Sequence, residues 1–301
     1  MKEETMNNKT ILVTGGTGFI GSHLVPALVE TGWNVVVLCH IHKPTPQKGV
    51  TMISIPAQAE GLHALLDKIM PSGIIHLATN FLLSAKEEDL GSIIRDNIEF
   101  GIRLIDAAVH SQVRFFINTG TFWQHYQGAE FDPVNFYAAS KQAFEDLAKF
   151  YYTQNLINFI TLSLNDTYGP NDTRQKLMNL WKKQSIDSRI PMKMSPGNQL
   201  LDILYIDDVV SGFLQILDLS WADTEKRLNG SHFYLSAEKK YSIKEYAAIF
   251  ETVSGQSLNI EWGARPYRNR EVMNPQCTGI PLPGWIQQVF PEEGIRRFLS
   301  D

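Results

Sequence analysis

The sequence predicts an α/β fold in which a doubly wound parallel sheet is followed by a smaller C-terminal lobe. A β-branched apolar run from Thr10 to Thr14 ends at a glycine-rich turn, as a buried strand would. Apolar residues at helical spacing start at Phe19, and a second apolar run covers 34–38. Because two parallel strands need a crossover connection, these pieces form a βαβ unit. Pro26 removes one backbone hydrogen bond from the helix, so we expect a kinked or shortened helix.

The same alternation continues through the first half of the chain. Further apolar runs typical of buried strands lie at 73–77, 114–117 and 158–162, and helical apolar patterns lie between them at 98–109 and 136–150. Strands that alternate with helices are typical of a doubly wound sheet with helices on both faces. The order of elements therefore supports the fold class that the first βαβ unit predicts.

Composition and charge exclude several classes of function. The chain of 301 residues has a formal net charge of -5, and its Lys and Arg residues are scattered, so we expect no nucleic-acid partner. No apolar run reaches the ~18 residues of a membrane span, and the N-terminus lacks a signal-peptide core. We therefore expect no membrane partner and a cytoplasmic location. Cys39, Cys277, His23 and His125 show no metal-ligand spacing, and His76 belongs to a strand, so no metal is predicted.

A glycine-rich turn connects the first predicted strand to the first predicted helix. A tight turn, a close approach of the backbone to a pyrophosphate, and close helix–strand packing each require a residue without a Cβ. The first N–H groups of the helix that follows can also bind an anion. The turn therefore predicts a dinucleotide cofactor, bound through Gly15, Thr17, Gly18, Phe19, Ile20 and Gly21.

The domain organisation follows from this turn and from a change in composition. After about residue 165, segments rich in Pro and Gly replace the regular alternation, although 201–217 returns to a strand-then-helix pattern. The prediction is a dinucleotide-binding Rossmann domain over 8–165 with return segments near 200–236, and a substrate-binding lobe over 166–199 and 237–301.

Tyr137 and Lys141 are a candidate catalytic pair. Their spacing puts the phenol and the ammonium on one face of a helix. An adjacent ammonium favours the phenolate, so it should bring the pKa of Tyr137 from the usual ~10 toward neutral pH. Such a tyrosine can pass a proton to or from a substrate oxygen, and Lys141 can also hold the nicotinamide ribose. The pair gains weight from its place after the phosphate-binding turn and a further strand.

Together, these features resemble the extended short-chain dehydrogenase/reductase family, the NAD-dependent epimerases and dehydratases. The resemblance covers almost the whole chain and is highly specific in combination. It implies a dinucleotide cofactor, a nucleotide-sugar substrate and a homodimer in which the helices around 93–110 and 135–152 pack against their symmetry mates. The motifs lie at 15–21, at Ile75 to Ala78, at Asn97, Thr119, Tyr137 and Lys141, at Asp166 to Pro170, and at Tyr205 to Val209.

The resemblance also implies roles for single residues. The family's Ser or Thr at the end of the fifth strand matches Thr119, with Thr121 close behind it. Either hydroxyl can form a hydrogen bond with the reacting oxygen. The cofactor contacts implied outside the glycine-rich turn are Leu77, Ala78, Asn97, Tyr137 and Lys141.

Within the family, the segments 121–124 and 166–174 are most similar to CDP-abequose and CDP-paratose synthases. Those enzymes reduce the 4-keto group of a CDP-linked 3,6-dideoxyhexose. Dehydratases of the family carry an Asp-Glu pair just after the catalytic Thr, where this chain has Gly120 and Thr121. Without a carboxylate acid and base at that place, elimination of water is not expected.

Two departures from the family concern the substrate's diphosphate. The family's Arg ahead of Asp202 is Leu201 here, and the Asn of its Asn-x-Tyr-Gly-Pro motif is Asp166, which we expect at the substrate. Other cations must therefore supply charge-assisted hydrogen bonds to the diphosphate. The candidates are Arg174 and Lys176, or Arg265, Arg268 and Arg270 in the last lobe.

The end of the second strand determines which dinucleotide is expected. NAD-binding members carry an Asp or Glu there, which accepts hydrogen bonds from the ribose 2′-OH and repels a 2′-phosphate. In this chain that position is Cys39, followed by His40, His42 and Lys43. We therefore expect NADPH to be preferred, with His40 and Lys43 at the 2′-phosphate. NAD stays the alternative, because the family's usual arginine is absent.

Three functions fit these motifs. The first is reduction of the 4-keto group of a nucleotide-linked, CDP-type 6-deoxy- or 3,6-dideoxyhexose for surface polysaccharides such as the lipopolysaccharide O-antigen. The second is a nucleotide-sugar 4-epimerase that uses the same residues and keeps NAD tightly bound. The third is a non-catalytic dinucleotide-binding regulator, which has no need of Thr119, Tyr137 and Lys141 together. Their joint presence argues against the third function, whereas the first two are not separated.

Overall fold

A central parallel sheet organises the protein, whose computed structural model describes residues 9–39, 48–56 and 60–300. The strands of the sheet are β1 (Thr10–Thr14), β2 (Asn34–Cys39), β3 (Val50–Ser54), β4 (Gly73–His76), β5 (Phe115–Thr121), β6 (Asn158–Leu164), β11 (His232–Tyr234) and β14 (Ile280–Pro281). Their order is β14-β11-β6-β5-β4-β1-β2-β3, and every pairing is parallel. The predicted fold class is confirmed.

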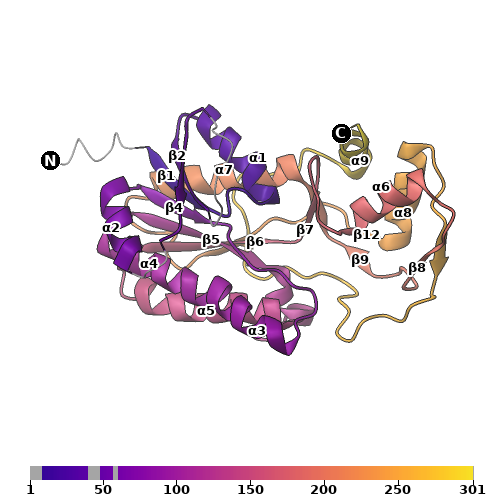
Figure 1. Cartoon of the computed structure of the whole chain (residues 1–301), viewed down its shortest axis with the longest axis horizontal. Coiled ribbons are helices and arrows are strands. Elements are labelled where there is room, and N and C mark those ends of the chain that lie inside the picture. Colours follow the sequence, from indigo (N-terminus) through magenta and orange to yellow (C-terminus); the bar gives the residue numbers. More distant parts are fainter. Residues whose placement is uncertain (1–8, 40–47, 57–59, 301) are drawn as a thin grey trace.

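Helices cover both faces of this sheet. They are α1 (Phe19–Glu30), α2 (Glu60–Ile69), α3 (Glu87–Ile94), α4 (Phe100–His110), α5 (Phe136–Tyr152) and α7 (Ile206–Ala222). Helices α1 and α7 pack together on one face, whereas α2, α4 and α5 cover the other (Figure 1). Helix α3 continues into α4 through a π-helical turn, Arg95–Glu99. Such turns are frequent at functional sites.

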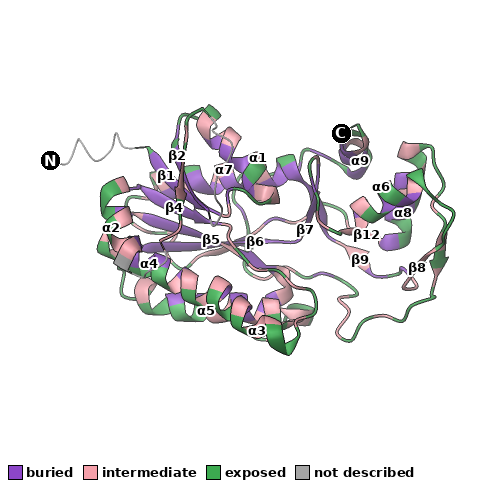
Figure 2. Cartoon of the chain, viewed as in Figure 1, coloured by how far each residue is buried: buried purple, intermediate pink, exposed green. Residues whose placement is uncertain are grey.

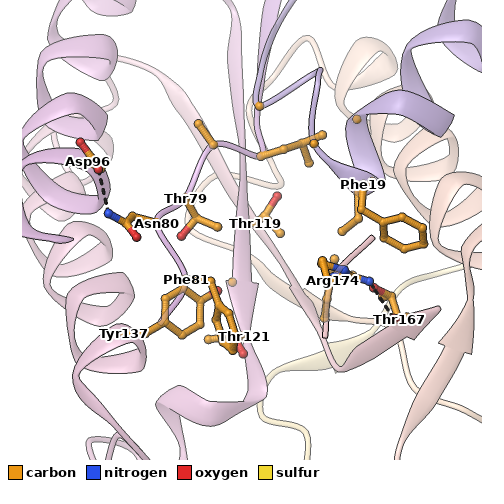
Figure 3. A pocket seen from close by; sticks show the side chains of 18 of the residues that line it. Phe19, Thr79, Asn80, Phe81, Asp96, Thr119, Thr121, Tyr137, Thr167 and Arg174 are labelled. Atoms are coloured by element: carbon orange, nitrogen blue, oxygen red, sulfur yellow. Dashed lines mark hydrogen bonds between the residues drawn. The ribbon is translucent and has the colours of Figure 1, made fainter. Parts of the chain in front are cut away.

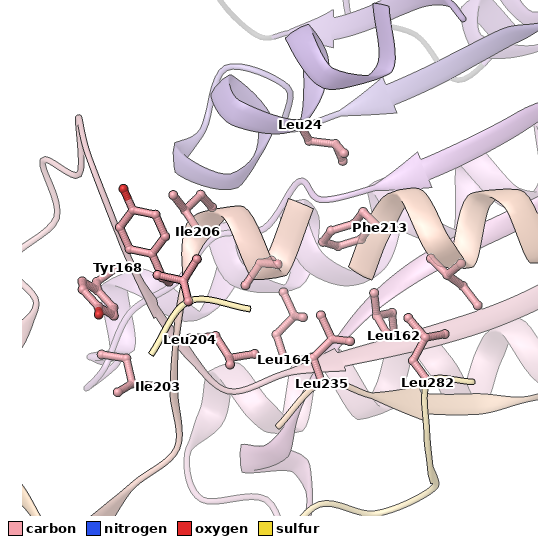
Figure 4. Close-up of a cluster of buried hydrophobic side chains, with 14 of the residues drawn as sticks. Leu24, Leu162, Leu164, Tyr168, Ile203, Leu204, Ile206, Phe213, Leu235 and Leu282 are labelled. Carbon is pink, nitrogen blue, oxygen red and sulfur yellow. The ribbon is translucent and has the colours of Figure 1, made fainter. Parts of the chain in front are cut away.

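Two apolar cores, one on each face of the sheet, hold these layers together. In β1, Ile11 and Val13 belong to the core with α1 and α7, whereas Leu12 belongs to the opposite core. Because successive side chains of a strand point to opposite faces, a strand buried on both faces needs a continuous apolar run. Figure 4 shows Leu24 of α1 and Phe213 of α7 in the first core. The buried residues concentrate in the sheet and on the inner faces of the helices (Figure 2).

The C-terminal lobe consists of short strands and helices beyond β6. They are β7 (Asp166–Tyr168), α6 (Leu177–Ile186), β8 (Met192–Met194), β9 (Leu200–Leu201), β10 (Ile203–Tyr205), β12 (Tyr241–Ser242), α8 (Ile243–Ser254), β13 (Ile260–Trp262) and α9 (Pro291–Leu299). Strand β7 pairs with β10 beside the sheet, and β8 with β13 and β9 with β12 form outer pairs (Figure 1). The N–H groups of Ser242 and Glu245 each bond the other residue's side chain, which starts α8.

The strands predicted from apolar runs are confirmed, whereas one strand was missed and, of the kink or shortening expected at Pro26, the shortening does not occur. Strand β3 was not predicted, because this edge strand is only half-buried and lacks a continuous apolar run. Helix α1 is not shortened at Pro26 but continues to Glu30. Burial of Leu24 and Leu28 on the same helix offsets the single backbone hydrogen bond that the proline removes.

The domain boundaries stay a prediction. Helix α7 and strand β11 lie on and in the sheet, and β14 joins its edge although it falls within the segment assigned to the lobe. A two-residue strand has no periodicity from which it could be predicted. Across the described part of the chain, no helix is both long and apolar enough to cross a membrane.

Candidate active site

A cavity of about 620 Å³ lies at the carboxyl ends of the central strands (Figure 3). Its lining combines the turn after β1 with the segments that follow β4, β5 and β6 and with the start of α5. Open α/β sheets bind ligands in this crevice. The residues predicted from sequence that line it are Gly15, Thr17, Gly18, Phe19, Ile20, Gly21, Leu77, Ala78, Thr119, Thr121, Tyr137, Asp166, Arg174 and Lys176.

The turn at 15–21 fits a dinucleotide pyrophosphate. A Cβ on Gly15 would lie 2.6 Å from the Ala78 nitrogen, and a Cβ on Gly21 would lie 2.3 Å from the Gly15 oxygen. Gly15 also has a φ of +70°, which L side chains rarely adopt. Gly18 is exposed, and α1 begins directly after it with first-turn N–H groups that have no acceptor within the helix. The tightly packed glycines and the free N–H groups at the start of α1 therefore lie together, as a site for a pyrophosphate requires.

Two threonine hydroxyls of β5 belong to the cavity. Among the described residues, Thr119 Oγ1 is buried without a hydrogen-bond partner, so a ligand oxygen can satisfy it. The N–H of Thr121, the last residue of β5, donates to Gln124 Oε1 at 2.8 Å. Between the threonines, a Cβ on Gly120 would lie 2.4 Å from Ser163 Oγ. A side chain at position 120 would therefore require the neighbouring side chains to shift.

Tyr137 and Lys141 start helix α5, whose N-terminus is capped by Asn135. The Asn135 side-chain oxygen accepts the N–H of Ala138 at 3.0 Å, which places Tyr137 in the first helical turn. Tyr137 lines the cavity, whereas Lys141 is buried behind it and is absent from the described lining. Tyr137 and Lys141 thus lie on one helix, as predicted, but of the two only the Tyr137 phenol lines the cavity.

The acidity of the pair differs from the sequence prediction. Burial raises the pKa of Tyr137 to about 12; a hydrogen bond with Thr79 opposes this rise, and the charge of Asp166 adds to it. Burial lowers the pKa of Lys141 to about 8, against the attraction of Glu145. The expectation that the pKa of Tyr137 lies below its usual value is therefore wrong, because removal of the phenol from water has the largest effect.

Three aromatic side chains, Phe81, Phe122 and Trp123, line the cavity near Tyr137, and we call them the aromatic cluster. The Phe81 ring meets the Tyr137 ring edge-on with centroids 4.9 Å apart, and it lies 5.9 Å from the Trp123 ring (Figure 3). Phe122 and Trp123 belong to the segment 121–124 that carries the finer resemblance, but no role was predicted for any of the three. They follow the ends of β4 and β5, so the rule that ligands bind at carboxyl ends could have found them.

Lys176, one of the predicted cations, lies at the cavity in an ion pair. Its Nζ is 2.8 Å from Asp166 Oδ1 and 4.9 Å from the centre of the Phe81 ring. All three residues line the cavity. The carboxylate that replaces the family's Asn is therefore neutralised by a lysine of the same cavity.

Arg174, the second predicted cation, is oriented by its neighbours. Asp172 accepts hydrogen bonds from its Nε at 2.7 Å and from its NH2 at 2.9 Å. The guanidinium lies 4.2 Å from the centre of the Phe19 ring at the start of α1, and NH2 also donates to the Thr167 carbonyl at 2.9 Å (Figure 3). This Arg therefore stands between the turn at 15–21 and β7.

The arginines of the last lobe are not brought to the cavity. Arg265 and Arg268 are exposed, and Arg270 pairs with Asp132. None of the three belongs to the described lining. The predicted role of Arg268 in substrate binding stays a prediction without support from the geometry.

Asn97 lies in the π-helical turn behind the cavity. Its side-chain oxygen accepts the Asn80 N–H at 2.6 Å and the Thr79 hydroxyl at 3.1 Å, and its amide donates to Ser140 Oγ at 2.9 Å. It thereby fixes the segment after β4 against α5. Because Asn97 is not among the described lining residues, its contact with a cofactor stays a prediction.

Other predicted and unpredicted residues complete the site. Cys39 ends β2 and lines the cavity, while His40 and Lys43 lie outside the described residues. His76 is buried in β4 as predicted, with Nδ1 2.7 Å from Thr14 Oγ1.

No cluster of His, Cys, Asp or Glu suited to a metal ion occurs in the described ranges. Lining residues that sequence reasoning missed are Leu38, Ile55, Thr79, Asn80, Asp96, Leu164, Asn165 and Thr167.

The βαβ turn, the parallel sheet and the cavity at its carboxyl edge define a dinucleotide-binding protein of the Rossmann type. Residues 11–229 match the model of the NAD dependent epimerase/dehydratase family, and the chain belongs to that family.

The chain is similar to several relatives and solved structures. The CDP-abequose synthase of Salmonella muenchen is 28% identical over 308 residues, which cover 97% of this chain and 98% of the relative. That of Yersinia pseudotuberculosis is 27% identical, covering 88% and 91%. The solved UDP-glucose 4-epimerase of Thermotoga maritima, with UDP-glucose, has a TM-score of 0.82 at 19% identity and 97% coverage of both chains. The UDP-glucuronic acid 4-epimerase of Bacillus cereus, with UDP-glucuronic acid and NAD, has a TM-score of 0.80 at 23% identity, covering 97% and 98%. The solved structures show a shared fold.

Proposed function

We propose that the protein is a reductase of the 4-keto group of a nucleotide-linked hexose, with NADPH as its preferred cofactor and NADH as the alternative. The substrate is a CDP-linked 6-deoxy- or 3,6-dideoxyhexose, and the product serves the synthesis of surface polysaccharides. Near full-length similarity to proteins named CDP-abequose synthase supports this choice within the family.

The observation that carries the proposal is that the described cavity offers no carboxylate ready to act as acid or base. Two acidic residues line it. Asp166 is paired with Lys176, and Asp96 accepts a hydrogen bond from Asn80 at 2.9 Å. Position 120, where dehydratases of the family carry an acid, is glycine in this chain. Elimination of water needs both a general acid and a general base, so reduction fits this cavity better.

The aromatic cluster supports a sugar that lacks hydroxyl groups on one side. Phe81, Phe122 and Trp123 present apolar ring surface beside Tyr137. A hydroxyl group buried against such rings would lose its hydrogen bonds to water without finding a partner, which costs free energy. A deoxygenated carbon loses nothing there and gains contact area.

The residues of the chain have distinct roles in this reaction. A reduced nicotinamide, when bound, supplies the hydride that C4 receives. Tyr137 donates the proton to the oxygen on C4, and its high pKa keeps the phenol protonated at neutral pH before each turnover. The buried hydroxyl of Thr119 donates a hydrogen bond to the same oxygen. Lys141, behind Tyr137, stabilises the phenolate that proton transfer leaves.

The test supplies the purified protein with a CDP-linked 4-keto-3,6-dideoxyhexose and NADPH carrying deuterium at the transferring position. We expect one cofactor to be oxidised per sugar and the deuterium to appear at C4 of the product, as mass spectrometry would show. A matched substrate that keeps the hydroxyl groups at C3 and C6 should react more slowly. Interconversion of C4 epimers without net oxidation, together with NAD that co-purifies with the protein, would instead establish the epimerase.

A further inference from the structure

A buried carboxylate lies one helical turn beyond the catalytic pair. Tyr137, Lys141 and Glu145 follow one another at intervals of four residues, so all three lie on the same face of α5. Lys141 is 2% exposed and Glu145 is 9% exposed. Lysine and glutamate are almost never buried this deeply unless an opposite charge or hydrogen bonds compensate them. Nothing in the proposed reaction itself uses Glu145.

Hydrogen bonds from the sheet hold the Glu145 carboxylate. The Asn118 amide of β5 donates to Glu145 Oε1 at 2.9 Å, and it is also 3.2 Å from Thr161 Oγ1 of β6. Gln124 forms a further hydrogen bond with Glu145 and accepts the N–H of Thr121 at 2.8 Å. Hydrogen bonds donated to a carboxylate favour its charged form. The same contacts tie Glu145 to the end of β5, which carries the threonines of the cavity.

Few ionisable groups face Lys141. From β4 it meets His76, whose pKa is lowered to about 3 by burial and by Lys141, so the imidazole is neutral at working pH. On its own helix, Glu145 one turn further on attracts it, and the Phe144 ring lies 6.0 Å from Nζ. Because Tyr137 is neutral until it gives up its proton, Glu145 is the negative charge that attracts Lys141 in the resting protein.

The groups that face Glu145 are equally few. Burial raises its pKa to about 7, while Lys141 and the hydrogen bonds from Gln124 and Asn118 lower it; Asp146 acts in the opposite direction. Tyr152 also faces it. Lys141 therefore supplies the positive charge that opposes protonation of Glu145. Each member of the pair favours the charged form of the other.

We propose that Glu145 is a positioning residue that keeps Lys141 charged behind Tyr137 during the reaction. The proposal rests on the roles assigned above to Tyr137 and Lys141. A buried ammonium without a counter-charge gives up its proton, and a neutral Lys141 cannot stabilise the phenolate left by proton transfer. Asn118 and Gln124 support this role, because they hold the carboxylate where it can act on Lys141.

The experiment measures the titration of Lys141 directly and needs no substrate. Protein carrying lysine labelled with carbon-13 at Cε is titrated by NMR, and the Lys141 signal is the one lost in Lys141→Arg. We expect a midpoint of about 8 in the unmodified protein. Glu145→Gln should lower the midpoint by about one pH unit, because it removes the opposite charge. Asp146→Asn, the control at an exposed position next to it, removes a charge that raises the pKa of Glu145, so it should not lower the Lys141 midpoint.

Turnover provides a readout that a purely structural role would not move. In Glu145→Gln the alkaline limb of the kcat profile should shift to lower pH by the same amount while KM changes little, and Glu145→Asp should restore part of the shift. If Glu145→Gln does not fold, Asn118→Ala should lower the Lys141 midpoint in the same direction by less. An unchanged midpoint in the folded variant overturns the proposal. A shifted midpoint in a protein that reduces no keto sugar overturns the proposed function and leaves the electrostatic role of Glu145 standing.

Discussion

The proposed reaction gives the cavity a cofactor side and a sugar side, and these two sides are built in different ways. On the cofactor side the surface is backbone, since Gly15 and Gly21 leave no space for a Cβ and α1 starts beside them. On the sugar side the surface consists of side chains from distant parts of the chain, among them Phe81, Lys176 and Asp166. A backbone turn that requires glycines can be recognised in the sequence as a local motif, whereas contacts between side chains that are distant in the sequence cannot. Substitutions should therefore disturb cofactor binding through sterics on one side and sugar binding through charge and apolar contact on the other.

The largest effect is expected from Tyr137→Phe, at the boundary between the two sides. The substitution removes the proton donor and keeps the ring that meets Phe81. We expect kcat to fall by at least about a hundredfold, since general acid catalysis contributes 10²–10⁴-fold. Cofactor affinity, measured by fluorescence titration, should survive. Turnover close to that of the unmodified protein would remove Tyr137 from the mechanism.

A smaller effect, confined to the cofactor side, is expected from Gly21→Ala. The new Cβ would meet the Gly15 oxygen at 2.3 Å, and because that atom is backbone the turn must shift. We expect cofactor affinity to fall by tenfold or more and the free energy of unfolding to fall by about 1–3 kcal/mol. Gly91→Ala is the matched control, since a Cβ there meets nothing within 4 Å. Equal behaviour of the two variants would contradict the steric account.

On the sugar side, Lys176→Met should raise KM for the nucleotide sugar by roughly tenfold. A charge-assisted hydrogen bond to phosphate contributes about 1.5–3 kcal/mol, and the variant also leaves Asp166 without its partner. Cofactor affinity should hardly change. Arg268→Met serves as the control, because Arg268 is exposed and stands outside the described lining. A larger effect of Arg268→Met than of Lys176→Met would show that the diphosphate lies elsewhere.

The same comparison explains how far sequence reasoning could go. The glycines of the turn, the alternating apolar runs and the Tyr-Lys spacing are local patterns, and each appears where it was predicted. The ion pair between Lys176 and Asp166 and the position of Phe81 depend on how the lobe meets the sheet, which no local pattern records. The prediction for the pKa of Tyr137 was wrong for the same reason. Burial raises this pKa, and burial depends on tertiary structure.

The smallest expected effect concerns the choice of dinucleotide, and it tests whether the cofactor side can also discriminate through side chains. Cys39 ends β2 and lines the cavity, with its Sγ 3.5 Å from the Ile53 carbonyl. A carboxylate at this strand end would accept hydrogen bonds from a ribose 2′-OH and repel a 2′-phosphate. The residues that follow, His40, His42 and Lys43, lie outside the described ranges. Their chemistry nevertheless favours a phosphate over a hydroxyl.

The preference for NADPH should be modest, because histidine is largely neutral at pH 7 and Lys43 alone then carries a full positive charge. One charge-assisted hydrogen bond at the lower end of 1.5–3 kcal/mol corresponds to about tenfold in kcat/KM. Cys39→Asp should reverse the order, since the carboxylate repels the phosphate and binds the hydroxyl instead. The measurement compares kcat/KM for NADPH and NADH in both proteins. Lower pH should strengthen the preference of the unmodified protein as His40 and His42 gain protons. If the unmodified protein prefers NADH, or if Cys39→Asp leaves the ratio unchanged, discrimination does not occur at the end of β2.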